Sequence, residues 1–182
     1  MTYTKYKNVS DMLLLSAVAL GLFTSTIFDK YDILYGREGL DYYAEVHKSK
    51  FNSWIHTFFM LGTVYGFSCS VPALFPINGQ FRNLMQRFVW IWYLSHYTTI
   101  DIGTTIGVFF AYVVPASKAF DRVTQNQSRL KLFLHGILWS VVCLGIQETF
   151  GHYIGGDDPS RPEGVWNAIV YAPMYSVWHI GK

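Results

Sequence analysis

Five long apolar segments constrain this sequence more than any other feature. They cover residues 12–28, 53–75, 88–114, 132–150 and 165–180, and polar segments separate them. A helix of about 20 predominantly apolar residues is long enough to cross the hydrocarbon core of a bilayer. The predicted fold is therefore all-α, a polytopic membrane helix bundle with about five to six apolar helical segments.

The composition supports the same class of protein. Hydrophobic residues make up 51% of the 182 residues and charged residues only 14%, whereas soluble domains average about 25% charged. The net charge of +2 is too small to indicate a nucleic-acid partner. Both cysteines, Cys69 and Cys143, lie inside apolar segments, so they predict no disulfide framework.

The segment 88–114 is long for one membrane helix and polar at its centre. As one helix its 27 residues would extend about 40 Å, beyond the roughly 30 Å of the hydrocarbon core. Asp101 at the helix centre would cost about 2.5–3.5 kcal/mol. We therefore expect a split hairpin at 101–103, with halves of about 20 Å that thin the bilayer or do not cross it. Residues 76–87 and 115–131 are expected to form a turn and a loop. The alternative is one tilted helix with Asp101 facing the interior.

The stretch from Tyr43 to His56 contains the strongest chemical signal. A nine-residue gap would put His47 and His56 on opposite faces of one continuous helix. Asn52 is of a residue type preferred as a helix N-cap, so we expect one helix to end near Lys50 and the next to begin directly after Asn52. The turn can then bring both imidazoles together as half of a metal site. The alternative is one interfacial histidine and one that packs between helices.

Glu148 and His152 offer the other half of such a site. They are four residues apart, so one helix face can carry both, and Gly151 is expected to end that helix as its C-cap. Imidazole binds iron and zinc, and two histidines with one carboxylate form the facial arrangement of non-haem Fe(II) oxygenases. Glu148 can instead accept a proton or hydrogen-bond His152. The remaining histidines are expected to pack, to form hydrogen bonds or to lie at the membrane interface: His96, His135 and His179.

The two halves meet only if the chain reverses near Asp101. His56 begins one apolar helix and His152 ends another. With a hairpin in 88–114, four crossings separate the two histidines, and they reach the same side of the membrane. With a single span, three crossings put them on opposite sides. The metal site and the break at Asp101 therefore depend on each other.

Several of these residues resemble the motifs of a known family. The spacing His47-x4-Asn52-x3-His56, with Tyr43 four residues before the first histidine, is similar to the opening motif of the Mpo1-like membrane proteins, the DUF962 family. Tyr97-x3-Asp101-x-Gly103 resembles the family's middle motif, where two membrane helices meet. Three later stretches resemble its remaining motifs: Phe150-Gly151-His152, Pro162 and Ala172-Pro173-Met174-Tyr175.

The chain departs from the family pattern at a few positions. The family's glutamine four residues before the Gly-His histidine falls on Glu148, with Gln147 one position away. Its Pro-Ala-Leu element reads Pro162-Glu163-Gly164 here. The acidic residue expected shortly after His152 is displaced to Asp157 or Asp158, and the segment 12–28 is an N-terminal addition.

The resemblance implies an enzyme of the endoplasmic-reticulum membrane. Family activity is Fe(II)-dependent dioxygenation that shortens 2-hydroxy fatty acids by one carbon, a lipid α-oxidation. By motif, Fe(II) would be the cofactor and its ligands would be His47, His56 and His152. The residues expected to carry the reaction are Tyr43, which would line the site, Asn52, which would shape the turn, and Glu148.

The expected organisation has two parts. Residues 1–40 would form an N-terminal extension with an added membrane helix, and residues 41–182 the Mpo1-like membrane domain. The expected partners are membrane lipid and a fatty-acid-like substrate. The alternative function is a non-catalytic Mpo1-like subunit with a structural role in a larger membrane protein complex, and the alternative location is the mitochondrial inner membrane.

Overall fold

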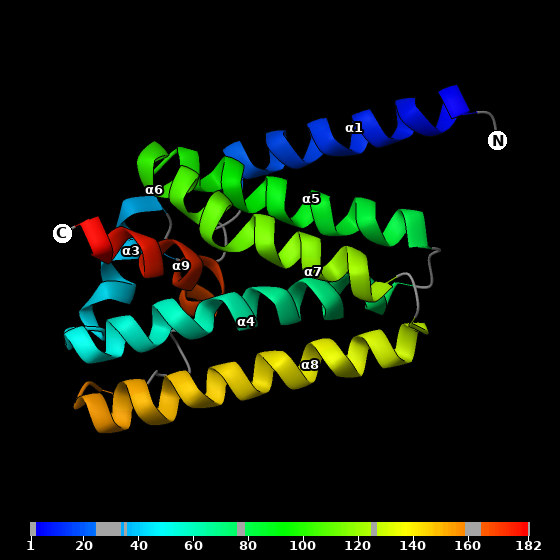
Figure 1. The fold of residues 1–182 in the computed structure, drawn as a ribbon. Helices are drawn as coiled ribbons and strands as arrows, with labels where there is room; N and C mark the ends of the chain where they lie inside the picture. Colours follow the sequence, from blue (N-terminus) through cyan, green and yellow to red (C-terminus); the bar gives the residue numbers. More distant parts are fainter. Residues whose placement is uncertain are drawn as a thin grey trace.

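The computed structural model describes residues 3–24, 34, 36–75, 79–124, 127–158 and 165–181, and the regular elements in these ranges are helical. They are α1 (Tyr3–Leu22), α3 (Gly36–Glu45), α4 (Lys50–Leu74), α5 (Gly79–Thr98), α6 (Ile102–Val108), η1 (Phe109–Val113), α7 (Val114–Thr124), α8 (Arg129–Ile146), η2 (Gln147–Ile154), α9 (Val165–Trp178) and η4 (His179–Gly181). Because α6, η1 and α7 are continuous, as are α8 with η2 and α9 with η4, the described residues form seven helices (Figure 1). The predicted all-α fold is confirmed.

Helices α4 and α8 lie side by side and antiparallel (Figure 1). Small residues on the facing sides let the two backbones approach closely. A Cβ added to Gly136 would meet the amide nitrogen of Ser70 at 2.5 Å and the carbonyl oxygen of Gly66 at 2.6 Å. Close backbone approach through small residues is how membrane helices gain van der Waals contact, since lipid gives no hydrophobic drive between them.

The break predicted near Asp101 is confirmed. Asp101 is the N-cap of α6, and its carboxylate accepts a hydrogen bond from the Thr104 N–H at 2.5 Å. This role explains why a carboxylate interrupts an apolar segment, because it satisfies an amide that a helix start leaves without a partner.

The predicted lengths of the two hairpin arms are wrong. Helix α5 already begins at Gly79, and the second arm continues to Thr124, so most of the expected turn at 76–87 and loop at 115–131 is helical. Proline lacks an N–H and its ring crowds the carbonyl four residues earlier. The π-helical turn η1 ends at Val113, two residues before Pro115, and the Val114 N–H donates a hydrogen bond to the Phe109 carbonyl. This wider turn lets the helix continue through the proline.

The hairpin sets the direction of the later helices. Successive helices run in opposite directions along the bundle: α4, α5, the α6–α7 arm and α8 (Figure 1). The start of α4 and the end of η2 therefore lie at the same end of the bundle, where α3 and α9 also pack together. This is the hairpin arrangement, which brings the two ends that carry His56 and His152 together.

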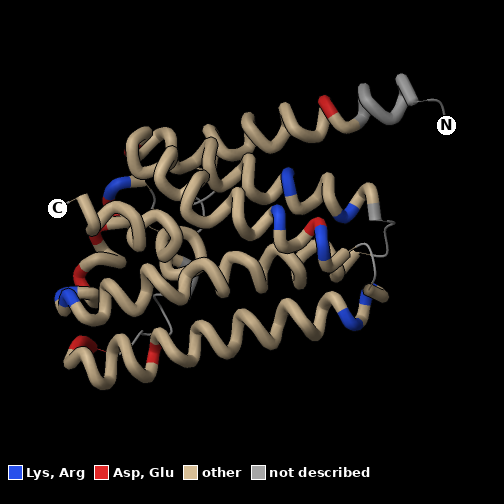
Figure 2. Tube along the Cα trace, viewed as in Figure 1, with Lys and Arg blue, Asp and Glu red and all other residues tan. Residues whose placement is uncertain are grey.

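Three helices are long and apolar enough to cross a membrane: Lys50–Leu74, Ile102–Thr124 and Arg129–Ile154, with 25, 23 and 26 residues. Charged residues gather toward the ends of the bundle, and the middle of α4 and of α8 is free of them (Figure 2). Helices of this length extend about 35–39 Å, so the bilayer thinning expected for shorter arms is not needed for them.

The N-terminal part of the chain is described only in part. The expected membrane helix at 12–28 corresponds to the end of α1, whose apolar stretch Ser10–Leu22 is shorter than the three spans, and residues 25–28 lie outside the described residues. Helix α1 packs along α5. The expected boundary after residue 40 falls inside α3, where Leu40 and Tyr43 are both buried in the core.

Candidate metal centre

A short link between α3 and α4 positions the first histidine. Helix α3 ends at Glu45 and α4 begins at Lys50, so His47 lies in the non-helical link. A break in this stretch is confirmed, but it lies earlier than predicted, because α3 ends at Glu45, not near Lys50, and α4 begins at Lys50, not after Asn52. The prediction that Asn52 caps the second helix is also wrong. Ser49 is the N-cap, and its hydroxyl accepts a hydrogen bond from the Asn52 N–H at 3.4 Å. Serine and asparagine cap helices about equally well, so residue type alone could not choose between them.

Three histidines from distant parts of the sequence converge inside the bundle. His47 comes from the link, His56 from the second turn of α4 and His152 from η2. The Nε2 atoms of His47 and His56 are 3.3 Å apart, and one ligating nitrogen from each of the three residues lies within 4.8 Å of the others. All three side chains are buried, with at most 3% exposure. The cluster could hold a metal ion.

The outer nitrogen of each ring has an oxygen partner. His47 Nδ1 lies 2.8 Å from the Tyr43 carbonyl oxygen, and His152 Nδ1 lies 2.6 Å from the Asp158 carbonyl oxygen. His56 Nδ1 lies 3.3 Å from the Tyr43 hydroxyl. A carbonyl can only accept, so His47 and His152 carry their proton on Nδ1 and have a lone pair on Nε2. Outer hydrogen bonds of this kind fix the tautomer and orientation of metal-binding histidines.

The inner nitrogen of His152 is the clearest indication that the cluster fits a metal ion. Its Nε2 is buried, and among the described residues it has no hydrogen-bond partner. A buried polar atom without a partner costs about 1–3 kcal/mol, and a bound metal ion would remove this cost. Burial also lowers the pKa of His47 from 6.5 to about 4, so this ring is neutral at pH 7, as a metal ligand must be. The residues present therefore fit a metal ion that accepts imidazole ligands, such as iron or zinc.

Asp157 and Asn52 form a layer behind the histidines. The Asp157 carboxylate accepts hydrogen bonds from the Ser49 N–H at 2.9 Å and from Asn52 Nδ2 at 2.8 Å. Asn52 Nδ2 also lies 3.4 Å from His152 Nδ1. A Cβ on Gly151 would collide with the Asn52 amide oxygen, so glycine is required at this position. Asp157 therefore connects the start of α4 to the segment that carries His152.

Glu148 lies beside the histidine cluster and outside it. Its Oε1 is 4.0 Å from His152 Nε2, and its side chain is 43% exposed. The expectation that Gly151 ends the helix is wrong, because the π-helix η2 continues to Ile154 and Gly155 is its C-cap. Gln147 is buried, and its Nε2 donates to the Thr63 hydroxyl at 2.9 Å. The buried amide at this end of the helix therefore belongs to Gln147, one residue before Glu148.

Two tyrosines support the link that carries His47. Tyr43 stacks on His47 with ring centroids 4.2 Å apart, and burial raises the pKa of its hydroxyl. The Tyr175 hydroxyl donates to the His47 carbonyl at 2.8 Å and lies 2.9 Å from the Ser53 hydroxyl. The sequence predicted a site role for Tyr43 and missed Tyr175. The signal was its hydroxyl inside the apolar segment 165–180.

The other three histidines make hydrogen bonds away from the cluster. His96 Nε2 lies 3.4 Å from the Tyr171 hydroxyl, and His135 Nε2 lies 2.9 Å from the Tyr65 hydroxyl. This confirms the packing and hydrogen-bonding roles expected for His96 and His135. His179 bonds the Tyr175 carbonyl through Nδ1 at 3.0 Å, so it lies behind the tyrosine that holds the link.

Comparisons of the chain with protein-family models, with curated proteins and with solved structures found no match. The resemblance to the Mpo1-like proteins therefore rests on the motif residues alone. Part of that pattern, Pro162-Glu163-Gly164, lies outside the described residues.

Proposed function

We propose that this protein is a membrane-embedded, Fe(II)-dependent dioxygenase that shortens 2-hydroxy fatty acids by one carbon. The observation that carries the proposal is the convergence of three buried imidazoles, one of which has an inner nitrogen with no hydrogen-bond partner in the described part of the chain. The motif resemblance supplies the choice of iron and of substrate. The location in the endoplasmic reticulum belongs to the same proposal and rests on the resemblance alone.

In this reaction the protein would hold the metal ion, orient its histidine ligands and exclude water from the site. His47, His56 and His152 would hold the ion through three nitrogens, which leaves coordination positions for other ligands. Bound Fe(II) would supply the O₂ chemistry that amino-acid side chains lack. Tyr43 orients His47 by stacking and His56 through its hydroxyl. Glu148 lies close enough to the cluster to receive a proton from a bound hydroxy acid.

The test combines metal analysis with product analysis. The purified protein in detergent is expected to bind about one equivalent of iron per chain. With Fe(II) and O₂ it should convert a 2-hydroxy fatty acid into the fatty acid one carbon shorter, detected by mass spectrometry, and leave the 3-hydroxy isomer unchanged. Tight zinc binding with no turnover would refute the dioxygenase and leave a metal site.

A non-catalytic subunit of a membrane complex is the second candidate. The observation that favours it is the outer face of α8, where Leu134, Leu138 and Val141 are 56%, 61% and 61% exposed and available to a partner helix or to lipid. A chain that binds no metal, and whose stability is unchanged by His47→Ala, would support this candidate over the enzyme.

A further inference from the structure

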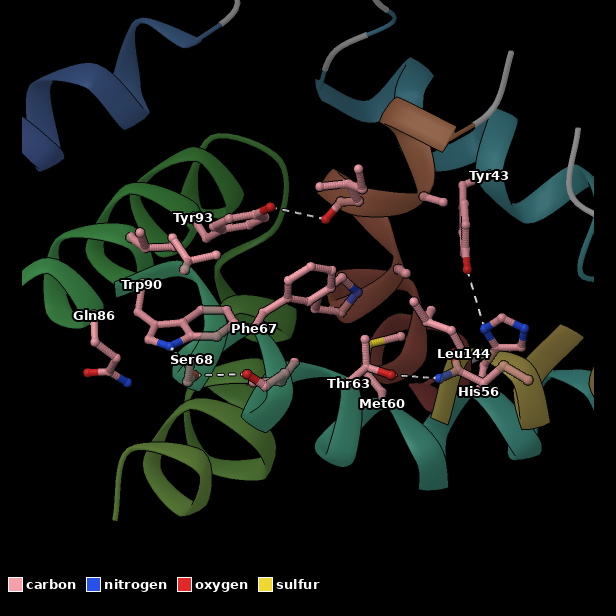
Figure 3. A pocket seen from close by; sticks show the side chains of 18 of the residues that line it. Tyr43, His56, Met60, Thr63, Phe67, Ser68, Gln86, Trp90, Tyr93 and Leu144 are labelled. Atoms are coloured by element: carbon pink, nitrogen blue, oxygen red, sulfur yellow. Dashed lines mark hydrogen bonds between the residues drawn. The ribbon is translucent and has the colours of Figure 1, made fainter. Parts of the chain in front are cut away.

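A cavity of about 520 Å³ begins at the histidine cluster and runs away from it through the bundle. Tyr43 and His56 line one end, and Gln86 and Trp90 line the other (Figure 3). Helix α4 forms one long wall, and residues of α5, the end of α8, η2 and α9 complete it. The histidine cluster therefore lies at one end of an internal cavity.

The wall formed by α4 gives the length of this space. The α4 residues that line the cavity recur on one face of the helix: His56, Met60, Val64, Phe67, Val71 and Pro72. His56 and Pro72 are sixteen positions apart, which is about 24 Å along an α-helix. Carbon–carbon bonds of about 1.52 Å at angles of about 111° advance about 1.25 Å per atom, so an extended chain of about 19 carbons fits this length.

The two ends of the cavity differ in chemistry. At the cluster end, the lining includes the titratable groups of His56, Tyr43 and Glu148. At the far end the polar groups have partners within the protein. Trp90 Nε1 donates to the Ser68 hydroxyl at 3.0 Å, and Gln86 Nε2 donates to the Ser117 hydroxyl at 2.7 Å. The far end therefore suits an apolar tip, and the cluster end suits a polar head.

The cavity also reaches the apolar outside of the bundle. Among the apolar residues that line it, three are more than one third exposed: Phe67 at 37%, Leu144 at 38% and Ile169 at 38%. They come from α4, α8 and α9. Leu144 lies within a helix that is long and apolar enough to cross a membrane, so this opening would face lipid acyl chains and not water. A lipid could enter through it sideways.

We propose that this cavity takes one unbranched hydrocarbon chain of about 18–20 carbons from the bilayer, with its polar head at the histidine cluster, and that Trp90 and the α4 turn at Val71 set the longest chain that fits. The inference deepens the proposed function, because it assigns the length of the acyl chain that the same site would accept. It also stands on its own as a binding property.

The test measures chain-length preference by binding, without turnover. The protein is placed in lipid nanodiscs, and saturated fatty acids of about 12 to about 24 carbons compete with a fluorescent fatty acid. Affinity is expected to rise up to about 18–20 carbons and then fall. In Val71→Trp the indole would fill about one helical turn of the cavity, and the preferred length should shorten by about four carbons.

Two further variants separate the proposal from unfolding and from general bulk. Leu74→Trp adds the same ring to the same end of α4, at a residue that is 61% exposed and does not line the cavity, and it should keep the wild-type profile. Trp90→Ala should shift the preferred length upward. Equal profiles for wild type and Val71→Trp, or a wild type without length preference, would overturn the inference.

Metal analysis of the same samples keeps the two proposals apart. Val71 is fifteen positions from His56, about 22 Å along the helix, so Val71→Trp should leave metal content unchanged. A chain-length preference in a protein without metal would support the cavity and refute the dioxygenase. Metal binding with a flat length profile would overturn the cavity inference and leave the metal site.

Discussion

The two ends of α4 use opposite kinds of residues to solve a packing problem. At its start, His56, Asn52 and Ser53 are buried and take part in a hydrogen-bonded polar network. Toward its end, Gly66 and Ser70 meet Gly136 of α8 at backbone contact distance. Packing at the first end depends on the chemical identity of the polar groups, and packing at the second end depends on the small size of the side chains.

This difference predicts two kinds of mutational response. A conservative change of a single atom should matter at the polar end, because a network in a medium of low polarity leaves any lost partner unsatisfied. At the small-residue end only added volume should matter. Metal affinity and thermal stability, measured on the same variants, separate the two responses.

The largest effect is expected from His152→Ala. This change removes the imidazole whose inner nitrogen lacks a partner, so bound metal should fall from about one equivalent per chain to near zero. The measurement is elemental analysis of purified protein. His135→Ala is the matched control, because it removes another histidine of the same apolar helix that bonds Tyr65 and not the cluster. Equal metal loss in both variants would contradict the site.

The second effect is expected from Gly136→Ala at the small-residue end. The added Cβ would meet Ser70 N and Gly66 O, which are backbone atoms and cannot rotate away. The expected loss is about 3 kcal/mol of folding free energy, at the upper end for overpacking. Gly145→Ala is the control, because no atom lies within 4 Å of its added Cβ, and it should stabilise the helix by about 0.5–1 kcal/mol. Thermal denaturation in detergent measures both, and a stable Gly136→Ala protein would break the comparison.

The third effect is expected from Asp157→Asn, a change of one atom behind the cluster. The neutral amide should hold Ser49 N–H and Asn52 less well and let His152 reorient. Metal affinity should fall about 10–100-fold, or about 1.4–2.7 kcal/mol. Asp158→Asn is the control, since His152 uses the backbone carbonyl of Asp158, which the substitution retains. Competition with a chelator gives both affinities, and similar losses would argue against a role for the Asp157 carboxylate.

The smallest effect is expected from Tyr175→Phe. It removes the hydroxyl that donates to the His47 carbonyl and keeps the ring. Stability should fall by about 0.5–1.5 kcal/mol, the usual value of one hydrogen bond, and metal content should be retained. A complete loss of metal would mean that this chain depends on Tyr175 more than the geometry indicates.

The sequence predicted which distant residues come together more accurately than it predicted where helices begin and end. Asp101 inside an apolar segment was a strong signal, since a carboxylate at the centre of a membrane helix is costly. The break before His56 was the condition for a shared site, since one continuous helix would put His47 and His56 on opposite faces. Together they predicted the chain reversal and the shared end of the bundle. Both features follow from residues whose polarity conflicts with their apolar neighbours.

What could not be predicted depends on contacts across the fold. Polarity suggested loops at 76–87 and 115–131, but charged side chains on a helix beyond the apolar region meet no penalty, so α5 and α7 extend into them. To predict Ser49 and not Asn52 as the cap, one would need to know the position of Asp157. This residue lies more than a hundred positions away and accepts a hydrogen bond from the Asn52 side chain. The role of Tyr175 could not be predicted for the same reason, because it depends on the hydrogen bond to the His47 carbonyl.

The π-helix η2 makes the number of residues in this chain as important as their identity. A π turn contains one residue more than the α turn it replaces. A one-residue deletion there can be absorbed when the π turn becomes an α turn, whereas inserting one residue beside Gly145 would rotate His152 by about 100° relative to the part of α8 that packs on α4. All the ligand side chains would still be encoded, yet one would face away from the other two. In this region, insertions should therefore be tolerated far less than substitutions on the exposed face.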